Sequence, residues 1–283
     1  MFKIIYQNGR GSIQFFGGGA CKNINLVSVE GVGLPIPEYQ TVTFANENGV
    51  TQAGKRDLPR TVTMSGDVKG GRQERLYMNR VLHEAGELLF LFDGVQRKLN
   101  CKCTRPPEFV HQGGGIFSFT IQFQADYPYF TDFKQVHAPL YKTINNVTDT
   151  FTLPCVFTSR ISRTDVLNNG DKYVYPTIYI EVTGASTDAG TLQIINHTTG
   201  AQIKINRQFA DGETVTVDLK TRRITSGAGG NITNAISDGT VLSAFYLQPG
   251  ENNIEFISSV SGQMVNAVAV FDNEYYSLEG DVV

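Results

Sequence analysis

Apolar and polar residues alternate along much of the chain, which is the pattern of strands in antiparallel sheets. The clearest case is Ile116–Ala125, where Phe117, Phe119, Ile121 and Phe123 alternate with polar residues. This alternation predicts a strand with one buried aromatic face and one wetted face. Short apolar runs bounded by turn-forming residues predict further strands in the first half, over residues 2–6, 13–16, 24–29, 42–44, 61–65, 88–92 and 95–104.

One stretch of the first half, residues 73–84, has the three- and four-residue spacing of an amphipathic helix. Its apolar stripe consists of Leu76, Met78, Val81 and Leu82. Gly86 stands where a glycine commonly ends a helix. The Asp93-Gly94 pair between two apolar runs then predicts a hairpin.

The second half contains strand patterns alone, separated by turns. They predict strands over residues 177–182, 191–195, 202–205, 213–219, 222–225, 254–258 and 265–271. Such regular spacing is typical of a sandwich or jelly roll. The fold class is therefore mainly β, built from β-sandwich domains, with one α-helix in the N-terminal domain.

The two halves meet at Asp126, Tyr127 and Pro128, which end the last strand of the first half because proline cannot donate to a ladder. We place an N-terminal domain at residues 1–135 and a C-terminal domain at residues 136–283. The length of 283 residues suits two domains. Residues 131–175 read as a connection into the second domain.

Composition excludes several classes of protein. Hydrophobic residues make up 41% and charged residues 18%, which argues against disorder. The formal net charge is -3 and no face of clustered Lys and Arg is evident, so nucleic-acid binding is not expected. We also expect no signal peptide and no membrane span, hence synthesis in the cytoplasm.

No cluster of reactive side chains stands out, so we expect no enzyme, no metal and no cofactor. Cys101-Lys102-Cys103 is a lone C-x-C pair, whereas zinc sites usually need two pairs. The four cysteines are expected to be free thiols: Cys21, Cys101, Cys103 and Cys155. The histidines lack metal-site spacing, although a dispersed catalytic triad stays open from sequence alone.

Tyr173, Tyr175 and Tyr179 near the start of the second domain leave a second hypothesis open. Aromatic rings on a sandwich face can stack on sugars, which would make the chain a carbohydrate-binding adhesion module. Tyrosines on strands more often pack against their neighbours, and tryptophan is absent from the sequence. Packing is therefore the favoured interpretation of these tyrosines.

Taken in order, these features resemble the distal tail proteins (Dit) of siphophages and related prophage tail components. The resemblance spans nearly the whole chain: short strands with a single helix, then the step D-Y-P-Y-F at 126–130. It continues with P-T-I-Y-I at 176–180 and I-I-N-H-T-T-G at 194–200. The most specific segment is L-Q-P-G-E-N-N-I-E-F at 247–256.

The resemblance implies a structural protein of the phage tail tip. The N-terminal domain would form a homohexameric ring, and a galectin-like C-terminal domain would lie outside it. The ring would join the tail tube protein to the tail-associated hub or fibre protein and to receptor-binding proteins, without nucleic acid or membrane.

A ring of one chain needs two complementary patches on each subunit. Exposed strand edges of the N-terminal half can pair between subunits. The densest basic stretch is a second candidate, interpreted as a solvated loop that reaches a neighbour or the lumen. Its proposed interface residues are Lys55, Arg56, Arg60 and Arg72.

Overall fold

The computed structural model describes residues 3–16, 24–45, 48–69, 71–92, 94–142, 161–184, 189–227, 230–259 and 264–278. The chain divides into two compact units. Unit 1 consists of Met1–Phe133 together with Glu274–Val283, and unit 2 consists of Lys134–Asn273. The mainly-β fold class with one helix is confirmed by the structure.

Unit 1 is built on a ten-stranded sheet with the order β22-β11-β8-β7-β1-β2-β3-β6-β10-β9. An additional pairing of β8 with β10 closes the sheet from β8 to β10 into a barrel. The strands of this sheet are β1 (Lys3–Asn8), β2 (Gly11–Phe16), β3 (Ile24–Glu30), β6 (Arg60–Lys69), β7 (Gly86–Phe92), β8 (Val95–Arg105), β9 (Val110–Gly113), β10 (Ile116–Ala125), β11 (Phe130–Asp132) and β22 (Glu274–Tyr275).

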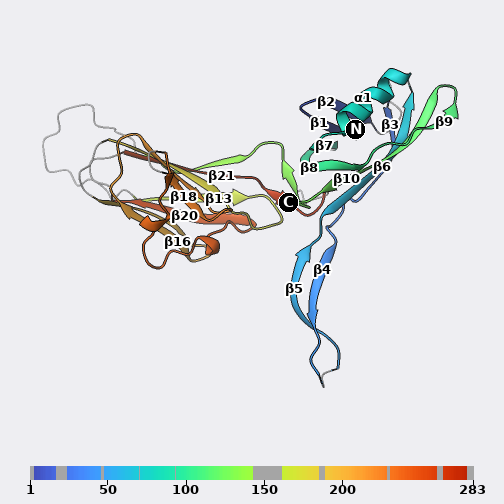
Figure 1. The fold of residues 1–283 in the computed structure, drawn as a ribbon. Helices are drawn as coiled ribbons and strands as arrows, with labels where there is room; N and C mark the ends of the chain where they lie inside the picture. Colours follow the sequence, from blue (N-terminus) through green and yellow to red (C-terminus); the bar gives the residue numbers. More distant parts are fainter. Residues whose placement is uncertain are drawn as a thin grey trace. The chain divides into compact units, whose positions relative to one another are not determined.

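The helix α1 (Arg72–Leu82) covers this sheet with Met78, Val81 and Leu82, which are buried (Figure 1). Leu76 was expected in the apolar stripe, but its side chain is 54% exposed. The reason is angular, because positions 76 and 78 lie about 200° apart around a helix of 3.6 residues per turn.

Gly86 does not end the helix, which corrects the prediction from sequence. It opens β7 and pairs with Cys101 of β8. A Cβ at Gly86 would lie 2.3 Å from the carbonyl oxygen of Gln7. The glycine is therefore required by the close approach of β1, not by a helix terminus.

The last residues of the chain belong to unit 1, whereas the sequence placed them in the C-terminal domain. β22 pairs with β11, with Phe130 opposite Tyr275. Tyr275 and Leu278 are buried in the hydrophobic core of unit 1. The first segment of unit 1 ends at Phe133, two residues before the domain boundary that the sequence predicted at residue 135.

Unit 2 is a sandwich of two sheets. The six-stranded sheet has the order β12-β21-β14-β17-β18-β19, and the four-stranded sheet has the order β13-β20-β15-β16. The strands are β12 (Val136–Lys142), β13 (Ile161–Asn168), β14 (Thr177–Thr183), β15 (Gly190–Asn196), β16 (Ala201–Arg207), β17 (Glu213–Asp218), β18 (Arg223–Ser226), β19 (Gly230–Asn231), β20 (Gly250–Ser258) and β21 (Met264–Phe271). The 3-10 helices η1 (Thr233–Ala235) and η2 (Leu242–Ala244) join β19 to β20.

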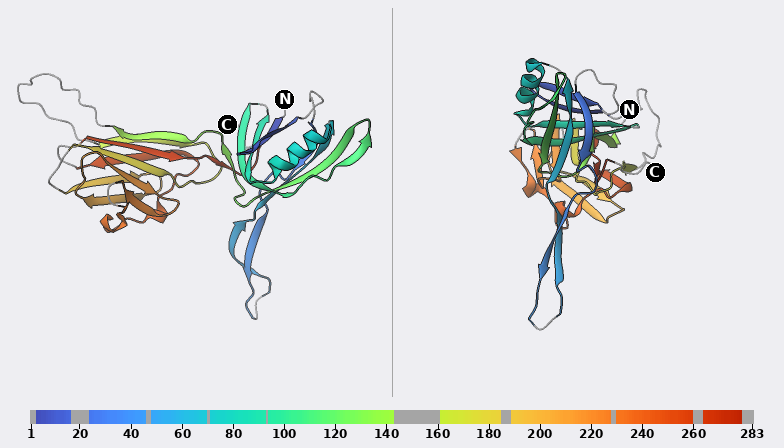
Figure 2. Two further views of the ribbon diagram at one scale, coloured as in Figure 1. Left: turned by 45° about the horizontal axis from the view of Figure 1, so that its top comes forward. Right: turned by 90° about the vertical axis from the view of Figure 1, so that its right-hand side faces the viewer.

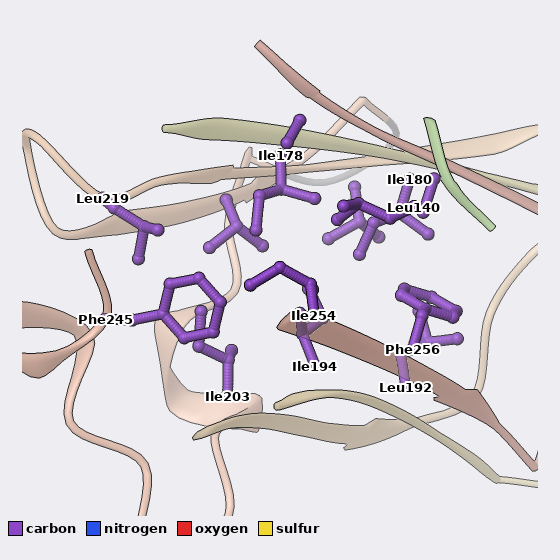
Figure 3. Packing of buried hydrophobic residues seen from close by; sticks show 14 of the residues in the cluster. Leu140, Ile178, Ile180, Leu192, Ile194, Ile203, Leu219, Phe245, Ile254 and Phe256 are labelled. Atoms are coloured by element: carbon purple, nitrogen blue, oxygen red, sulfur yellow. The ribbon is translucent and has the colours of Figure 1, made fainter. Parts of the chain in front are cut away.

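The inward residues of both sheets form one core in unit 2. On β14, Ile178 and Ile180 are buried while Tyr179 between them is exposed, which is the predicted alternation. Figure 3 shows Ile178 and Ile180 on one side of this core, facing Ile254 and Phe256 on the other. β12 and β13 lie in the stretch that the sequence treated as a connection.

Candidate assembly surface

Two strands of unit 1 form a small sheet of their own. β4 (Pro37–Val42) pairs with β5 (Thr51–Asp57), and neither strand pairs with another described strand. We call residues 34–45 and 48–57 the arm. Figures 1 and 2 show it as a ribbon that extends away from the large sheet of unit 1. The sequence predicted a loop over part of this region, so β5 was missed.

The arm carries large apolar side chains in contact with solvent. Six of them are between 43% and 76% exposed: Leu34, Ile36, Tyr39, Val42, Phe44 and Val50. Single exposed apolar residues are ordinary, but a group on one element marks an interaction site. A two-stranded hairpin is also only marginally stable in water by itself. The arm is thus an apolar surface that a partner can cover.

Arg60 holds the root of the arm and is not a surface cation. Arg60 is only 4% exposed, so it does not lie in a solvated loop as the sequence analysis expected, and its interface role stays a prediction. The guanidinium donates to the carbonyl oxygens of Gly31 at 2.8 Å and Gly33 at 2.6 Å, just before β4. It also donates to Pro128 at 2.6 Å and Tyr276 at 2.7 Å.

The buried guanidinium of Arg60 remains charged at neutral pH. Burial lowers its pKa to about 10, and the carboxylate of Asp57 acts in the opposite direction. The ring of Phe130 lies 4.5 Å from the guanidinium carbon and adds a cation–π contact. One residue therefore joins the entry of the arm, the end of β10 and the returning C-terminal segment.

A second contact fixes the exit of the arm. The hydroxyl of Tyr129 donates to the carboxylate of Asp57, the last residue of β5, at 2.7 Å. The amide of Leu58 donates to the carbonyl oxygen of Ile36 at 2.9 Å. Gly31 adopts φ +84°, and a Cβ there would lie 1.9 Å from the carbonyl oxygen of Thr61. The root is thus specified by side chains and by one obligatory glycine.

The other predicted interface cations lie on separate elements. Lys55 and Arg56 are exposed on β5, where Arg56 pairs with Glu38 of β4 and Lys55 lies 3.9 Å from Asp57. Arg72 is exposed at the first position of α1. The ten-residue strand β6 separates Arg72 from the arm, so the four residues do not form one patch.

The predicted boundary residues Asp126, Tyr127 and Pro128 lie inside unit 1. Asp126 accepts from the ammonium of Lys102 at 3.0 Å. The hydroxyl of Tyr127 donates to the carboxylate of Glu274 at 2.6 Å. Tyr127 therefore contacts the returning segment, and the chain leaves unit 1 further on, after Phe133.

Two tyrosines that the sequence selected in unit 2 do come together. The ring of Tyr173 lies 5.8 Å from that of Tyr175 and 5.3 Å from that of Tyr246, which the sequence did not select. Val174 pairs with Leu247, so all three tyrosines flank this one β-bridge. Tyr179 lies on β14 and makes no ring contact with them among the described residues.

No group of three or more His, Cys, Asp and Glu residues suited to a metal occurs in the described part of the chain. Cys101 and Cys103 are free thiols there, with pKa values that burial raises to about 12 and about 11. Cys21 and Cys155 lie outside the described residues. Among the described helices, none is long and apolar enough to span a membrane.

The apolar arm residues were missed by the sequence analysis. In this stretch Pro35, Pro37 and Tyr39 alternate with Ile36 and Glu38. Both sets contain apolar residues, so the pattern does not distinguish a buried face from a solvent-exposed face. A strand that begins at a proline and mixes polar and apolar residues on both faces, as β4 does, is typical of an edge or a free ribbon.

Comparison with known proteins agrees with this architecture. The model of the siphovirus-type tail component family, C-terminal domain, matches residues 169–275, which cover most of unit 2 and the two residues of β22 in unit 1. The Dit protein of phage SPP1, described as a paradigm of the hub adsorption apparatus in phages that infect Gram-positive hosts, has the same fold. Its structure aligns with a TM-score of 0.63 at 16% identity, covering 96% of this chain and 99% of that one.

Two structures of the phage P2 baseplate in its activated conformation, one with Ca and one with Sr, align with TM-scores of 0.43. Identity is 11% and 10%, over 94% and 95% of this chain and 97% and 98% of those chains. That degree of likeness supports no conclusion. No curated protein matches the chain. Residues 169–275 thus match the C-terminal domain of siphovirus-type tail components, and the chain as a whole has the fold of SPP1 Dit, in agreement with the sequence resemblance.

Proposed function

We propose that the chain is a structural component of the tail tip that closes into a homohexameric ring through unit 1. The observation that carries this proposal is the arm, a two-stranded ribbon with six exposed apolar side chains. Fully burying one such side chain contributes about 1.5–3 kcal/mol. A neighbouring subunit is the partner that a ring of identical copies supplies to every arm.

In this proposal the ring joins the tail tube protein to the tail-associated hub or fibre protein and the receptor-binding proteins. The chain is made in the host cytoplasm and becomes part of the virion. The fold shared with SPP1 Dit, a hub protein, supports this role. In this proposal the protein acts by assembly and not by catalysis.

The mass of the purified chain in solution tests the ring. We expect light scattering after size-exclusion chromatography to give about six times the subunit mass of 31.1 kDa. The variant Ile36→Ser, Tyr39→Ser, Val42→Ser should remain folded but lose the ring, because it removes apolar surface from the arm. The matched control Gln40→Ser, Gln52→Ser changes exposed polar residues of the same strands and should keep the ring. A monomeric wild-type chain would refute the proposal.

A second function, glycan binding by unit 2, is favoured by the cluster of Tyr173, Tyr175 and Tyr246. Tyr173 is 48% exposed, and the ammonium of Lys172 lies 5.7 Å from its ring centre. Exposed aromatic faces beside polar side chains suit sugar rings. We expect the full-length chain to retain glycans on an array of bacterial cell-wall oligosaccharides, and Tyr173→Ala to lose them. Tyr179→Ala is the control, since Tyr179 is equally exposed but outside the cluster. An array without bound glycan rules this function out.

A further inference from the structure

A groove on unit 1 has the properties that the arm requires of a docking site. Its volume is about 410 Å3, and it lies where β3, β6, β9 and β10 meet the end of β8. The residues of its lining that matter here are Val27, Asp67, Arg105, Glu108, Val110 and Phe119. We call this surface the β9 groove.

The β9 groove offers apolar contacts because of a local irregularity in β3. The pairing of β3 with β6 shifts between Leu26 and Ser28, so Val27 is the extra residue of a bulge. Val27 is 66% exposed, and Val110 on the facing side of the groove is 57% exposed. Gly66 lets β3 and Phe119 approach closely, since a Cβ there would lie 2.1 Å from the carbonyl oxygen of Asn25 and 2.9 Å from the ring of Phe119.

The β9 groove also offers a free strand edge. β9 is the last strand in the order of its sheet, and all four of its residues are exposed. It pairs with β10 on one side, and no described strand pairs with the other. An edge of this kind accepts a further strand from another chain through main-chain hydrogen bonds.

The charged residues of the β9 groove and of the arm indicate which segment docks in the groove. The lining contains two carboxylates, Asp67 and Glu108, and one cation, Arg105, and neither carboxylate forms an ion pair within the described residues. The arm carries Lys55 and Arg56, which are exposed beside its apolar side chains and which pair with Asp57 and Glu38 of the arm in the isolated chain. Apolar contacts and opposite charges are thus present on two surfaces of the same chain.

The two surfaces of one copy do not reach each other. The arm leaves unit 1 beside Arg60 at the start of β6, whereas Asp67 lies seven residues further along that strand. At about 3.3 Å per residue the separation is on the order of 23 Å. The arm extends from the opposite end of β6, away from the groove (Figures 1 and 2).

We propose that the arm of each copy docks in the β9 groove of the next copy. The inference rests on the proposed ring and names its two contact surfaces. The contact is heterologous, so it repeats from copy to copy and closes when the rotation between copies allows it.

A charge exchange tests the docking in the full-length chain. Lys55→Glu, and separately Asp67→Lys with Glu108→Lys, should each raise the concentration at which half of the ring dissociates by about ten-fold or more. The chain that carries all three substitutions should return to within about three-fold of the wild type, because opposite charges face each other again. The docking is overturned if the concentration for half dissociation does not change in the separate variants, or if the chain with all three substitutions does not return toward the wild-type value.

Disulfide formation gives a second measurement that does not depend on charge. Val42→Cys and Val110→Cys are combined in a background with Cys21→Ser, Cys103→Ser and Cys155→Ser. We expect oxidation to produce a ladder of linked copies. Val42→Cys with Val241→Cys is the control, since Val241 is 54% exposed but belongs to unit 2.

The outcomes separate this inference from the proposed function. If the wild-type chain forms a ring but the variant with Val42→Cys and Val110→Cys gives no ladder, the proposed ring stands and the β9 groove is excluded as its contact. A wild-type chain that stays monomeric at every concentration excludes both.

Discussion

The Nη2 atom of Arg60 lies 2.7 Å from the carbonyl oxygen of Tyr276, across 216 positions of the sequence. The same guanidinium holds the entry of the arm through Gly31 and Gly33. The geometry of the arm and the attachment of the C-terminal segment therefore depend on one side chain. Four predictions follow from this and from three other features.

Replacing Arg60 by Met should destabilise unit 1 by about 3 kcal/mol or more, because several buried or half-buried carbonyl oxygens lose their donor. Denaturant unfolding followed by tyrosine fluorescence measures the change. Arg56→Met is the control, since that exposed ion pair is worth about 0–1 kcal/mol. Equal losses for the two variants would show that Arg60 is not a structural centre.

Gly31→Ala should destabilise the root of the arm by about 2 kcal/mol or more. The backbone there has φ +84°, and a methyl group would lie 1.9 Å from the carbonyl oxygen of Thr61. Gly33→Ala has open space around the new methyl group and should change stability by no more than about 1 kcal/mol. Thermal unfolding of both variants compares them. The idea fails if Gly33→Ala is the more harmful change.

The thiols of Cys101 and Cys103 should resist alkylation in the native protein. Burial raises their pKa values to about 12 and about 11, so the reactive thiolate is scarce at pH 8. In the protein used for this measurement Cys21 and Cys155 are replaced by Ser, so that only Cys101 and Cys103 can be alkylated. Iodoacetamide at pH 8 should react on the order of 100-fold more slowly than in 6 M guanidinium chloride. Comparable rates in both conditions contradict the burial.

Glu255 in unit 2 should make stability depend on acid pH. Its hydrogen bond with His197, followed by the charge of Arg163, lowers the pKa of Glu255 although burial opposes the shift. A carboxyl with a lowered pKa stabilises the fold above its unfolded pKa of about 4.3, and this contribution is lost as the pH falls through the folded pKa. Glu255→Gln should therefore lower the melting temperature at pH 7.

The difference between wild type and Glu255→Gln should shrink when melting is repeated at pH 3. Glu251→Gln removes an exposed carboxylate of the same strand and should leave the melting temperature unchanged at both pH values. A difference for Glu255→Gln that persists undiminished at pH 3 would count against the ionised contact.

Strands with regular alternation were predicted well from the sequence. β10 spans Ile116–Ala125 in both the prediction and the structure, because its aromatic residues all lie on one face. Residues whose role depends on distant partners could not be predicted. Arg60 looks like its neighbours Lys55 and Arg56 in the sequence, and only the convergence of segments around residues 31, 128 and 276 reveals that it is buried.

The arm and the C-terminal segment were missed for related reasons. The apolar residues of β4 lie in a ribbon without a buried face, so periodicity carries no information about burial there. β22 has two residues, and its partner β11 comes more than 140 positions earlier. No local pattern specifies a pairing of that kind. The exposed apolar surface of the arm and the return of the C-terminal segment therefore became visible only in three dimensions.

Because β22 returns to unit 1, unit 2 is an insertion between two segments of one continuous core. A protein cut after residue 135 would lose Tyr275 and Leu278 from that core, and a fragment that starts at 136 would carry an unpaired tail. Grafting should instead exchange Lys134–Asn273 as a block, with both junctions left in place. The same arrangement lets unit 2 diversify during evolution while unit 1 keeps both of its segments.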